Sequence, residues 1–171
     1  MNTFKRTLAC VLLIALCLAL CCCGEPNTTK GTEGLEYEIY RDGYRVTGYH
    51  GEDPHVVIPD TYKGIPVLMI EHKSFEGSDI QSVVIGKNVE EIEYSAFISC
   101  VLLKEVYISA SVRVIGGSER YNGAFLGCRN LETVTFADDS QLEIVGKYAF
   151  NGCDALDLEL PSAYYERNNA K

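Results

Sequence analysis

Length, composition and charge define the broad class of this chain. Its 171 residues are 47% hydrophobic and 23% charged, which suits one domain with a buried core. The formal net charge is −9, and the longest cluster of basic residues is Lys5-Arg6. Because phosphate binding needs clustered Lys and Arg, this composition argues against a nucleic-acid-binding protein.

Residues 1–23 have the parts of an export signal. Lys5-Arg6 precedes an apolar run over residues 8–20, and 13 residues are too few for a membrane-spanning helix, which needs about 20. The run ends in three cysteines and resembles the lipobox of bacterial lipoproteins. We expect acylation at Cys23, with Cys22 and then Cys21 as alternatives, or an ordinary cleaved signal peptide. The protein is therefore expected to be exported and lipid-anchored at the cell envelope or cell surface.

Two short segments follow the signal. Residues 24–34 combine Gly, Pro, Thr and charged residues without apolar periodicity, which predicts a flexible tether. In residues 35–55, alternating apolar residues flank Asp42-Gly43. That pattern predicts a β-hairpin with its turn at Asp42-Gly43, forming an N-terminal cap.

Residues 56–161 contain an internal repeat, which aligns on four phenylalanines. The spacings between these phenylalanines are 22, 28 and 25 residues. Each is followed by Ser or Cys, a branched apolar residue and a pair of apolar residues with one residue between them. After the first three, a second apolar pair follows, whose members are three positions apart. The unit is F-x-x-C-x-x-L-x-x-V-x-I-x-x-x-V-x-x-I, with phenylalanines at Phe75, Phe97, Phe125 and Phe150. The extra residues, 116–122 and 137–141, are expected to be loops.

The unit resembles the BspA-like leucine-rich repeat, A-F-x-x-C-x-x-L-x-x-V-x-I-P. Ala precedes Phe97, Phe125 and Phe150, whereas Ser74 and Ser78 depart from the pattern in the first copy. The resemblance implies an α/β-type repeat solenoid with a parallel β-sheet face, mostly strand and turn. The polar residues 162–171 would form a C-terminal tail.

The alternating V-x-I pairs explain why such repeats must stack. Their period is that of a half-buried strand, and one strand cannot bury its inner face alone. Coils stacked about 4.7–4.9 Å apart would form a parallel sheet. The phenylalanines should then form one column through the core.

Three cysteines, Cys100, Cys128 and Cys153, occupy one repeat position. We expect them to pack in the core as small hydrophobic side chains. A disulfide between two neighbouring coils is the second possibility, because export permits one and the spacing suits it. Zinc is the least favoured, since a linear row offers no tetrahedral cage.

No residue pattern points to catalysis. His50, Asp53 and His55 are close enough in sequence to bind a cation, but their spacing matches no metal motif, and a loop is the favoured interpretation. Glu90, Glu91 and Glu93 are expected to form a solvated surface. We therefore expect no enzyme activity, no metal, no cofactor and no small-molecule substrate.

The central residue of each V-x-I pair should point outward. These residues form a stripe with little charge, which suits a protein contact: Val57, Val84, Tyr107, Thr135 and Glu159. A sheet's ordinary preference for β-branched and aromatic residues explains the stripe equally well. The loop at 116–123, with Arg120 and Tyr121, is a second candidate.

The BspA-like resemblance implies the kind of function. Similar proteins are adhesins, so it implies a non-catalytic surface module for a protein or cell-surface partner. The alternative is a structural or envelope-assembly lipoprotein without an external ligand.

Overall fold

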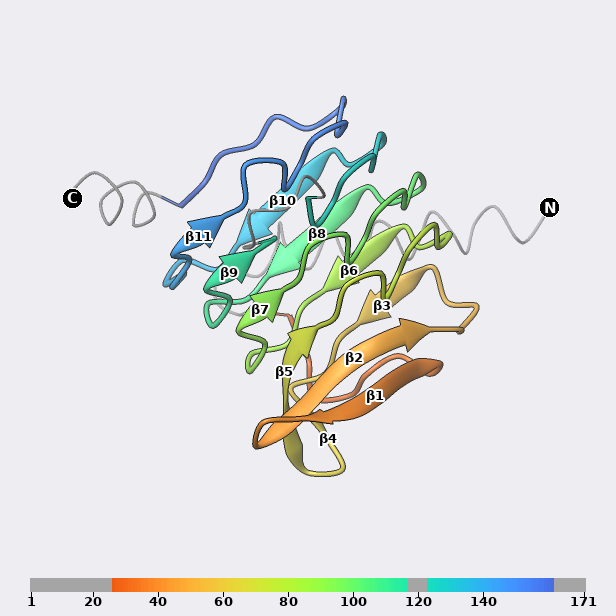
Figure 1. The fold of residues 1–171 in the computed structure, drawn as a ribbon, viewed down its shortest axis with the longest axis vertical. Helices are drawn as coiled ribbons and strands as arrows, with labels where there is room; N and C mark the ends of the chain where they lie inside the picture. Colours follow the sequence, from red (N-terminus) through yellow and green to blue (C-terminus); the bar gives the residue numbers. More distant parts are fainter. Residues whose placement is uncertain (1–25, 117–122, 162–171) are drawn as a thin grey trace.

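The computed structural model describes residues 26–116 and 123–161, and within them the chain forms eleven strands and no helix (Figure 1). The strands are β1 (Leu35–Tyr40), β2 (Gly43–Tyr49), β3 (His55–Val57), β4 (Thr61–Tyr62), β5 (Ile65–Ile70), β6 (Ser82–Val84), β7 (Glu91–Ile92), β8 (Glu105–Ile108), β9 (Val114–Ile115), β10 (Thr133–Phe136) and β11 (Ile144–Val145).

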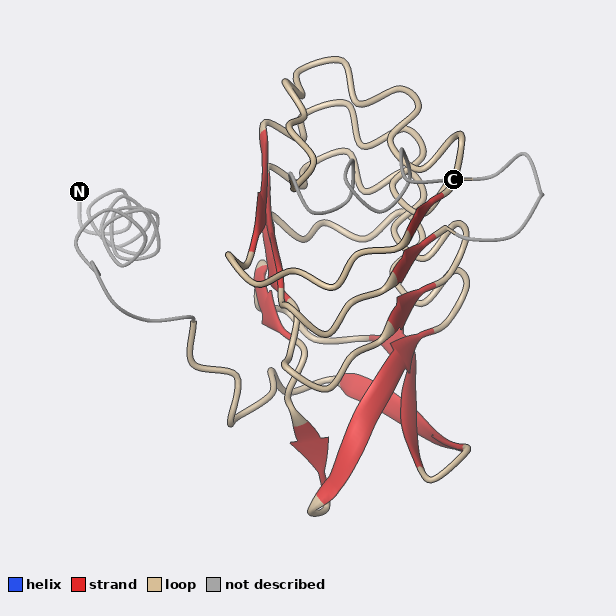
Figure 2. Cartoon of the chain, turned by 90° about the vertical axis from the view of Figure 1, so that its left-hand side faces the viewer, coloured by secondary structure: helices blue, strands red, loops and turns tan. Residues whose placement is uncertain are grey.

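The strands form two sheets on opposite sides of a solenoid (Figure 2). Sheet 1 has the order β10-β8-β6-β3, and all of its neighbouring strands are parallel. Sheet 2 has the order β1-β2-β5-β7-β9-β11, with β4 paired to β5. The predicted repeat solenoid with a parallel sheet face is therefore confirmed.

The two apolar pairs of each repeat contribute to different sheets. The V-x-I pairs form sheet 1, where Val83 of β6 lies in register between Val56 of β3 and Val106 of β8. The second pairs form the short strands of sheet 2, such as β7 and β9. Sheet 2 was not predicted, because its pairs are spaced by three residues and lack the alternating period of a strand.

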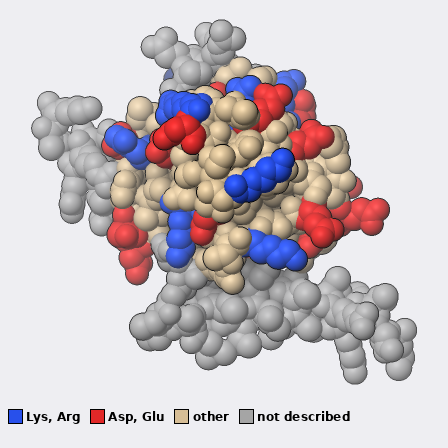
Figure 3. Space-filling view, turned by 90° about the horizontal axis from the view of Figure 1, so that it is seen from below, with Lys and Arg blue, Asp and Glu red and all other residues tan. Residues whose placement is uncertain are grey.

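The hairpin predicted over residues 35–55 is present as β1 and β2, which pair antiparallel. Its turn is Arg41-Asp42 and not Asp42-Gly43, since Tyr40 pairs with Gly43. Arg41 takes the left-handed conformation with φ 54°. Strand β2 also pairs parallel with β5, so the hairpin extends sheet 2 and closes the lower end of the solenoid (Figures 1 and 3).

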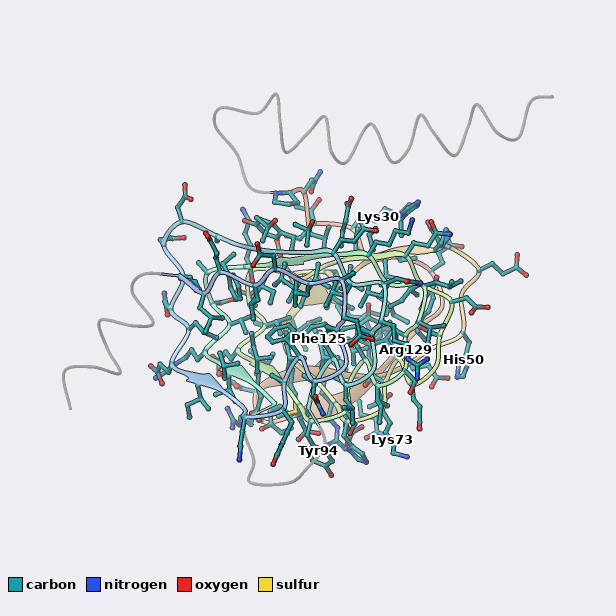
Figure 4. All side chains as sticks on the ribbon, turned by 90° about the horizontal axis from the view of Figure 1, so that it is seen from above. Lys30, His50, Lys73, Tyr94, Phe125 and Arg129 are labelled. Atoms are coloured by element: carbon teal, nitrogen blue, oxygen red, sulfur yellow. The ribbon has the colours of Figure 1, made fainter. Side chains whose placement is uncertain are left out.

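The phenylalanines form the predicted column inside the coils, and Figure 4 shows Phe125 within the ring of backbone. Adjacent ring centroids are 4.8 Å apart for Phe75 and Phe97, 4.9 Å for Phe97 and Phe125, and 5.2 Å for Phe125 and Phe150. Tyr49 of β2 extends the column, with its centroid 5.7 Å from that of Phe75. The hairpin thus supplies an aromatic ring where a preceding coil would have supplied one.

A left-handed residue follows each phenylalanine by two positions and reverses the chain before the next coil segment. Three of the four are glycine, which adopts this conformation without a steric penalty. Their φ angles are 65°, 60°, 76° and 74° at Gly77, Ser99, Gly127 and Gly152. This glycine is a repeat signal that the apolar alignment did not use.

The predicted flexible tether at residues 24–34 is wrong for its described part, residues 26–34, which form a strap along the edge of sheet 1. The Thr32 backbone N–H donates to the Val57 carbonyl (3.1 Å), and its hydroxyl oxygen accepts from the Val57 N–H (2.8 Å). The buried Thr28 accepts a backbone bond from Asp60 (2.9 Å) and donates its hydroxyl to the Asp60 carboxylate. The strap satisfies edge groups of β3 that composition alone does not reveal.

Several predictions lie outside the described residues. They are the signal at residues 1–23 with Cys23, the loop residues Arg120 and Tyr121, and the tail at residues 162–171. Among the described residues, no helix is long and apolar enough to cross a membrane.

Candidate partner-binding face

The outer face of sheet 1 carries two rows of side chains that run from coil to coil. The first row follows the predicted stripe, since Val57 pairs with Val84, Val84 with Tyr107, and Tyr107 with Thr135. The second row lies two residues earlier on each strand and consists of His55, Ser82, Glu105 and Thr133. Successive coils thus place equivalent residues side by side on a parallel sheet.

The residues of the stripe are not equally accessible. Val57, Val84 and Thr135 are partly exposed, whereas Tyr107 is only 9% exposed. The expectation that Tyr107 is an exposed member is therefore wrong. Its in-register neighbours are Val84 on β6 and Thr135 on β10.

Glu159, the fifth predicted member of the stripe, is exposed but belongs to no strand among the described residues. The hydrogen-bonded rows of sheet 1 therefore reach β10 and stop one coil short of Glu159. The structure brings four of the five predicted residues together on one sheet.

A histidine and a serine meet in the second row. His55 Nδ1 is 2.8 Å from Ser82 Oγ, a hydrogen bond between β3 and β6. The Asp53 carboxylate accepts from the backbone N–H of His55 (2.8 Å) and is not bound to its ring. Ser82 is 6% exposed, which is poor access for a nucleophile. The geometry therefore suits a structural hydrogen bond between β3 and β6 better than a catalytic pair.

The outer face of sheet 2 has a different character, because its charged side chains are paired with one another. Arg45 lies between Glu38 (2.8 Å) and Glu71 (2.9 Å), and Arg113 Nη2 is 2.7 Å from Glu143 Oε1. The hydrogen bond that Arg45 donates to the Glu38 carboxylate raises the pKa of Arg45. These pairs occupy charged groups that a partner would otherwise contact.

The acidic run near sheet 2 is only partly a solvated surface. Burial raises the pKa of Glu91, and the nearby Glu93 carboxylate raises it further. Glu93 is 3.5 Å from His72, whose ring stacks on Tyr94 at a centroid distance of 5.5 Å. Tyr94 and Lys73 lie outside the coil in Figure 4. The run therefore contributes to inter-coil contacts.

The three described cysteines are free thiols. Each Sγ–H donates to the carbonyl of the phenylalanine one coil earlier, as in Cys100 to Phe75 (2.9 Å) and Cys128 to Phe97 (3.0 Å). Cys100 and Cys128 are fully buried, as expected for core packing. No group of three or more His, Cys, Asp or Glu within residues 26–116 and 123–161 could hold a metal ion.

A groove of about 600 Å³ lies between residues 30–34 of the strap and residues 50–53 that follow β2. Its lining includes His50, whose Nε2 is 3.5 Å from the Glu36 carboxylate, and Asp53. His50 and Asp53 therefore reach the same groove, whereas the His55 ring is bonded to Ser82. The structure does not assemble the three into one site.

Comparisons with known proteins place this architecture in a family of repeats. The family model described as the BspA type leucine rich repeat region matches residues 55–170 in six copies. No curated protein sequence matches the chain significantly.

Two solved structures are similar to the chain. A leucine-rich repeat protein of T. pallidum is 28% identical with a TM-score of 0.65, over 74% of this chain and 58% of that one. A leucine-rich repeat protein from Bacteroides ovatus is 26% identical with a TM-score of 0.58, over 76% of this chain and 34% of that one. The chain thus spans less than two thirds of either relative.

Proposed function

The chain belongs to the BspA-type leucine-rich repeat family, and on that premise we propose that it is a non-catalytic module that binds a protein or cell-surface partner through the outer face of sheet 1. Repeats of this family form protein-interaction or structural modules. The proposal assigns the partner contact to Val57, Val84 and Thr135, with the edge of Tyr107 between them and Glu159 beyond the sheet.

One observation carries this proposal, the in-register stripe from Val57 to Thr135. Its accessible side chains are aliphatic or hydroxyl groups, which lose little solvation energy when a partner covers them. The charged face of sheet 2 is the less suitable surface, because a partner there would have to displace ion pairs such as Arg113–Glu143. Residues 26–34 bind the β3 edge, so that edge is not open to a partner.

We further propose that residues 1–23 export the chain and that Cys23 carries the lipid anchor, with Cys22 and Cys21 as the alternative sites. A lipid anchor would display the stripe at the cell surface. The intact mass of the membrane-bound form of the full chain tests this, because acylation adds the mass of at least two acyl chains. An unmodified mature mass contradicts the lipid anchor, whereas acylation that persists in Cys23→Ser assigns the anchor to Cys22 or Cys21.

Binding is tested with the purified full chain on an array of matrix and cell-surface proteins. Val84→Lys/Thr135→Lys places two charges on the stripe and should lower partner binding at least tenfold, because both side chains are partly exposed and their burial against a partner would strand the charges. Tyr107 is left intact because its substitution would disturb a largely covered side chain.

The matched control is Val114→Lys/Ile144→Lys, which adds the same charges to an in-register row on the outer face of sheet 2. It should retain binding. Equal loss in both variants, or unchanged binding in the stripe variant with an unchanged melting temperature, rejects the assignment. Failure of the wild-type chain to bind any partner would favour the structural or envelope-assembly alternative.

A further inference from the structure

The lower end of the molecule has a second surface that the stripe does not use, the outer edge of β1. Strand β1 is the terminal strand of sheet 2, and within residues 26–116 and 123–161 no strand pairs with its outer edge. By contrast, the strap covers the corresponding first edge of sheet 1. An open edge strand presents backbone donors and acceptors to any chain that can pair with it.

The edge is regular enough to accept another strand. The register between β1 and β2 shifts between Glu36 and Tyr37, and the extra residue, Thr47, lies on β2. A bulge on β1 itself would twist the edge away from a partner. Strand β1 has no such bulge over its six residues.

Alternation gives the two sides of β1 different chemistry. On one side lie Glu36 and Glu38, which contact His50 (3.5 Å) and Arg45 (2.8 Å). Arg45 is shared with Glu71, and the Glu36 and Glu38 side chains remain 57% and 60% exposed, so both can take a further cationic neighbour. On the other side lie Tyr37 and Ile39, and Ile39 is 80% exposed, compared with 47% for Ile144. An exposed isoleucine at the end of an edge strand is costly unless something covers it.

An aromatic cluster supports the apolar side. The Tyr37 and Tyr62 rings stack with centroids 3.9 Å apart, and Tyr44 meets Tyr62 edge-on at 5.1 Å. These rings come from β1, β2 and β4, so they form a rigid platform. Clustered tyrosines of this kind are frequent at the centres of protein interfaces. Figure 3 shows this end as uncharged surface crossed by separate charged side chains.

From this geometry we propose that β1 is a docking site for an extended basic segment of a partner protein, which adds as a further strand to sheet 2. Its side chains alternate, with Lys or Arg opposite Glu36 and Glu38 and apolar residues opposite Tyr37 and Ile39. Backbone hydrogen bonds supply the attraction, and the alternating pattern supplies the selectivity.

The charges argue against a second copy of this chain as the occupant. In antiparallel self-pairing centred on Tyr37, Glu36 of one copy faces Glu38 of the other. Centring on Glu38 places that carboxylate opposite its own counterpart. Like charges directly opposite each other destabilise a strand pair, whereas a basic strand places a cation opposite each carboxylate.

The probe for this site is a fluorescently labelled, end-capped peptide of alternating Lys and Val, titrated with the full chain at low salt. The peptide should bind, and Glu36→Lys/Glu38→Lys should weaken binding by about tenfold, the effect of replacing two exposed attractive pairs with repulsive ones. A Glu-Val peptide should show the opposite preference, and an unchanged melting temperature shows that the variant is folded. Glu132→Lys/Asp139→Lys, which changes the charge equally at exposed positions away from β1, should leave binding unchanged.

The same Lys-Val peptide with an N-methyl group on every backbone amide separates strand addition from simple charge attraction, because neither of its edges can then donate to β1. It should not bind, because it cannot complete the hydrogen-bond ladder. Equal binding of the methylated peptide, equal loss in both charge variants, or no binding at all overturns the proposal. Concentration-dependent dimerisation of the chain that the Lys-Val peptide does not reverse identifies a second copy as the occupant and also overturns it.

Discussion

The two ends of the solenoid differ in how they finish the same stack of coils. At the N-terminal end, the hairpin places Tyr49 on Phe75, and Phe75 is 1% exposed. At the C-terminal end, Phe150 stacks on Phe125 but remains only half-buried, as do Cys153 and Leu156. Their equivalents one coil earlier, such as Cys128 and Leu131, are fully buried.

The difference shows that burial in this fold depends on neighbours on both sides. A repeat residue becomes fully buried only when another coil or a cap lies above it and below it. The N-terminal hairpin performs that role with a different sequence, because it needs only a ring of suitable size at Tyr49. We therefore expect stability to be graded along the phenylalanine column, highest in the middle and lowest at Phe150.

Removing a ring from the middle of the phenylalanine column should have the largest effect on the free energy of unfolding. Phe125 is fully buried between Phe97 and Phe150. Phe125→Ala should therefore lower the free energy of unfolding by about 3–5 kcal/mol, measured by urea denaturation. A loss below about 1 kcal/mol would mean that the column is not the core of the stack.

Removing the aromatic ring of the cap should have the next largest effect. Tyr49→Ala would expose one face of Phe75 and remove the Tyr49 hydroxyl's bond to the Asp53 carbonyl (2.8 Å). We expect a loss of about 2–3 kcal/mol by the same measurement. Tyr49→Phe is the control that keeps the ring and should lose about 1 kcal/mol. Equal losses in the two variants would show that the ring does not act as a cap.

Truncation of Phe150 to Ala at the C-terminal end should lower the free energy of unfolding by less. Phe150 is half-buried, so Phe150→Ala removes less apolar contact and leaves a site that solvent can enter. The expected loss is about 1–2 kcal/mol, roughly half that of Phe125→Ala. If both variants lose the same amount, the C-terminal coil is covered as fully as the middle of the stack, and the two ends do not differ.

The sequence predicted the features that depend on repetition. The phenylalanine column and the register of Val57, Val84 and Thr135 follow from spacing alone. It did not predict features that depend on single contacts. Thr32 binds the β3 edge through one backbone and one side-chain bond, and its segment has the composition of a linker.

Two further departures have physical reasons of the same kind. The hairpin of β4 and β5, which turns at Lys63-Gly64 with φ angles of 52° and 77°, was not predicted, because β4 has only two residues and shows no alternating pattern. Tyr107 alternates correctly, yet its accessibility depends on the neighbours that flank it. Alternation predicts which way a side chain points, but not how much of it a partner can reach.

The smallest expected effect is a pH dependence confined to the cap. Burial, with a contribution from Tyr62, raises the pKa of Tyr37 from 10.0 to about 12. The folded cap therefore favours the neutral phenol. Its contribution to stability is complete below pH 10 and is lost as the pH rises from 10 towards 12.

Melting temperatures at pH 9 and pH 11 test this dependence. The wild-type chain should lose more stability over this interval than Tyr37→Phe, which cannot ionise at that position. Other groups that titrate at high pH act in both proteins, so the difference between them isolates Tyr37. An identical loss in both would mean that the phenol does not contribute in this range.

Photo-crosslinking in intact cells tests most directly whether partners dock on the outer face of sheet 1. A photoreactive phenylalanine derivative is placed in the full chain at Val84 of sheet 1 or at Val114 on the outer face of sheet 2, both partly exposed and β-branched. We expect a discrete partner adduct from position 84 and none from position 114. Adducts from position 114 alone, or equal adducts from both positions, would contradict it.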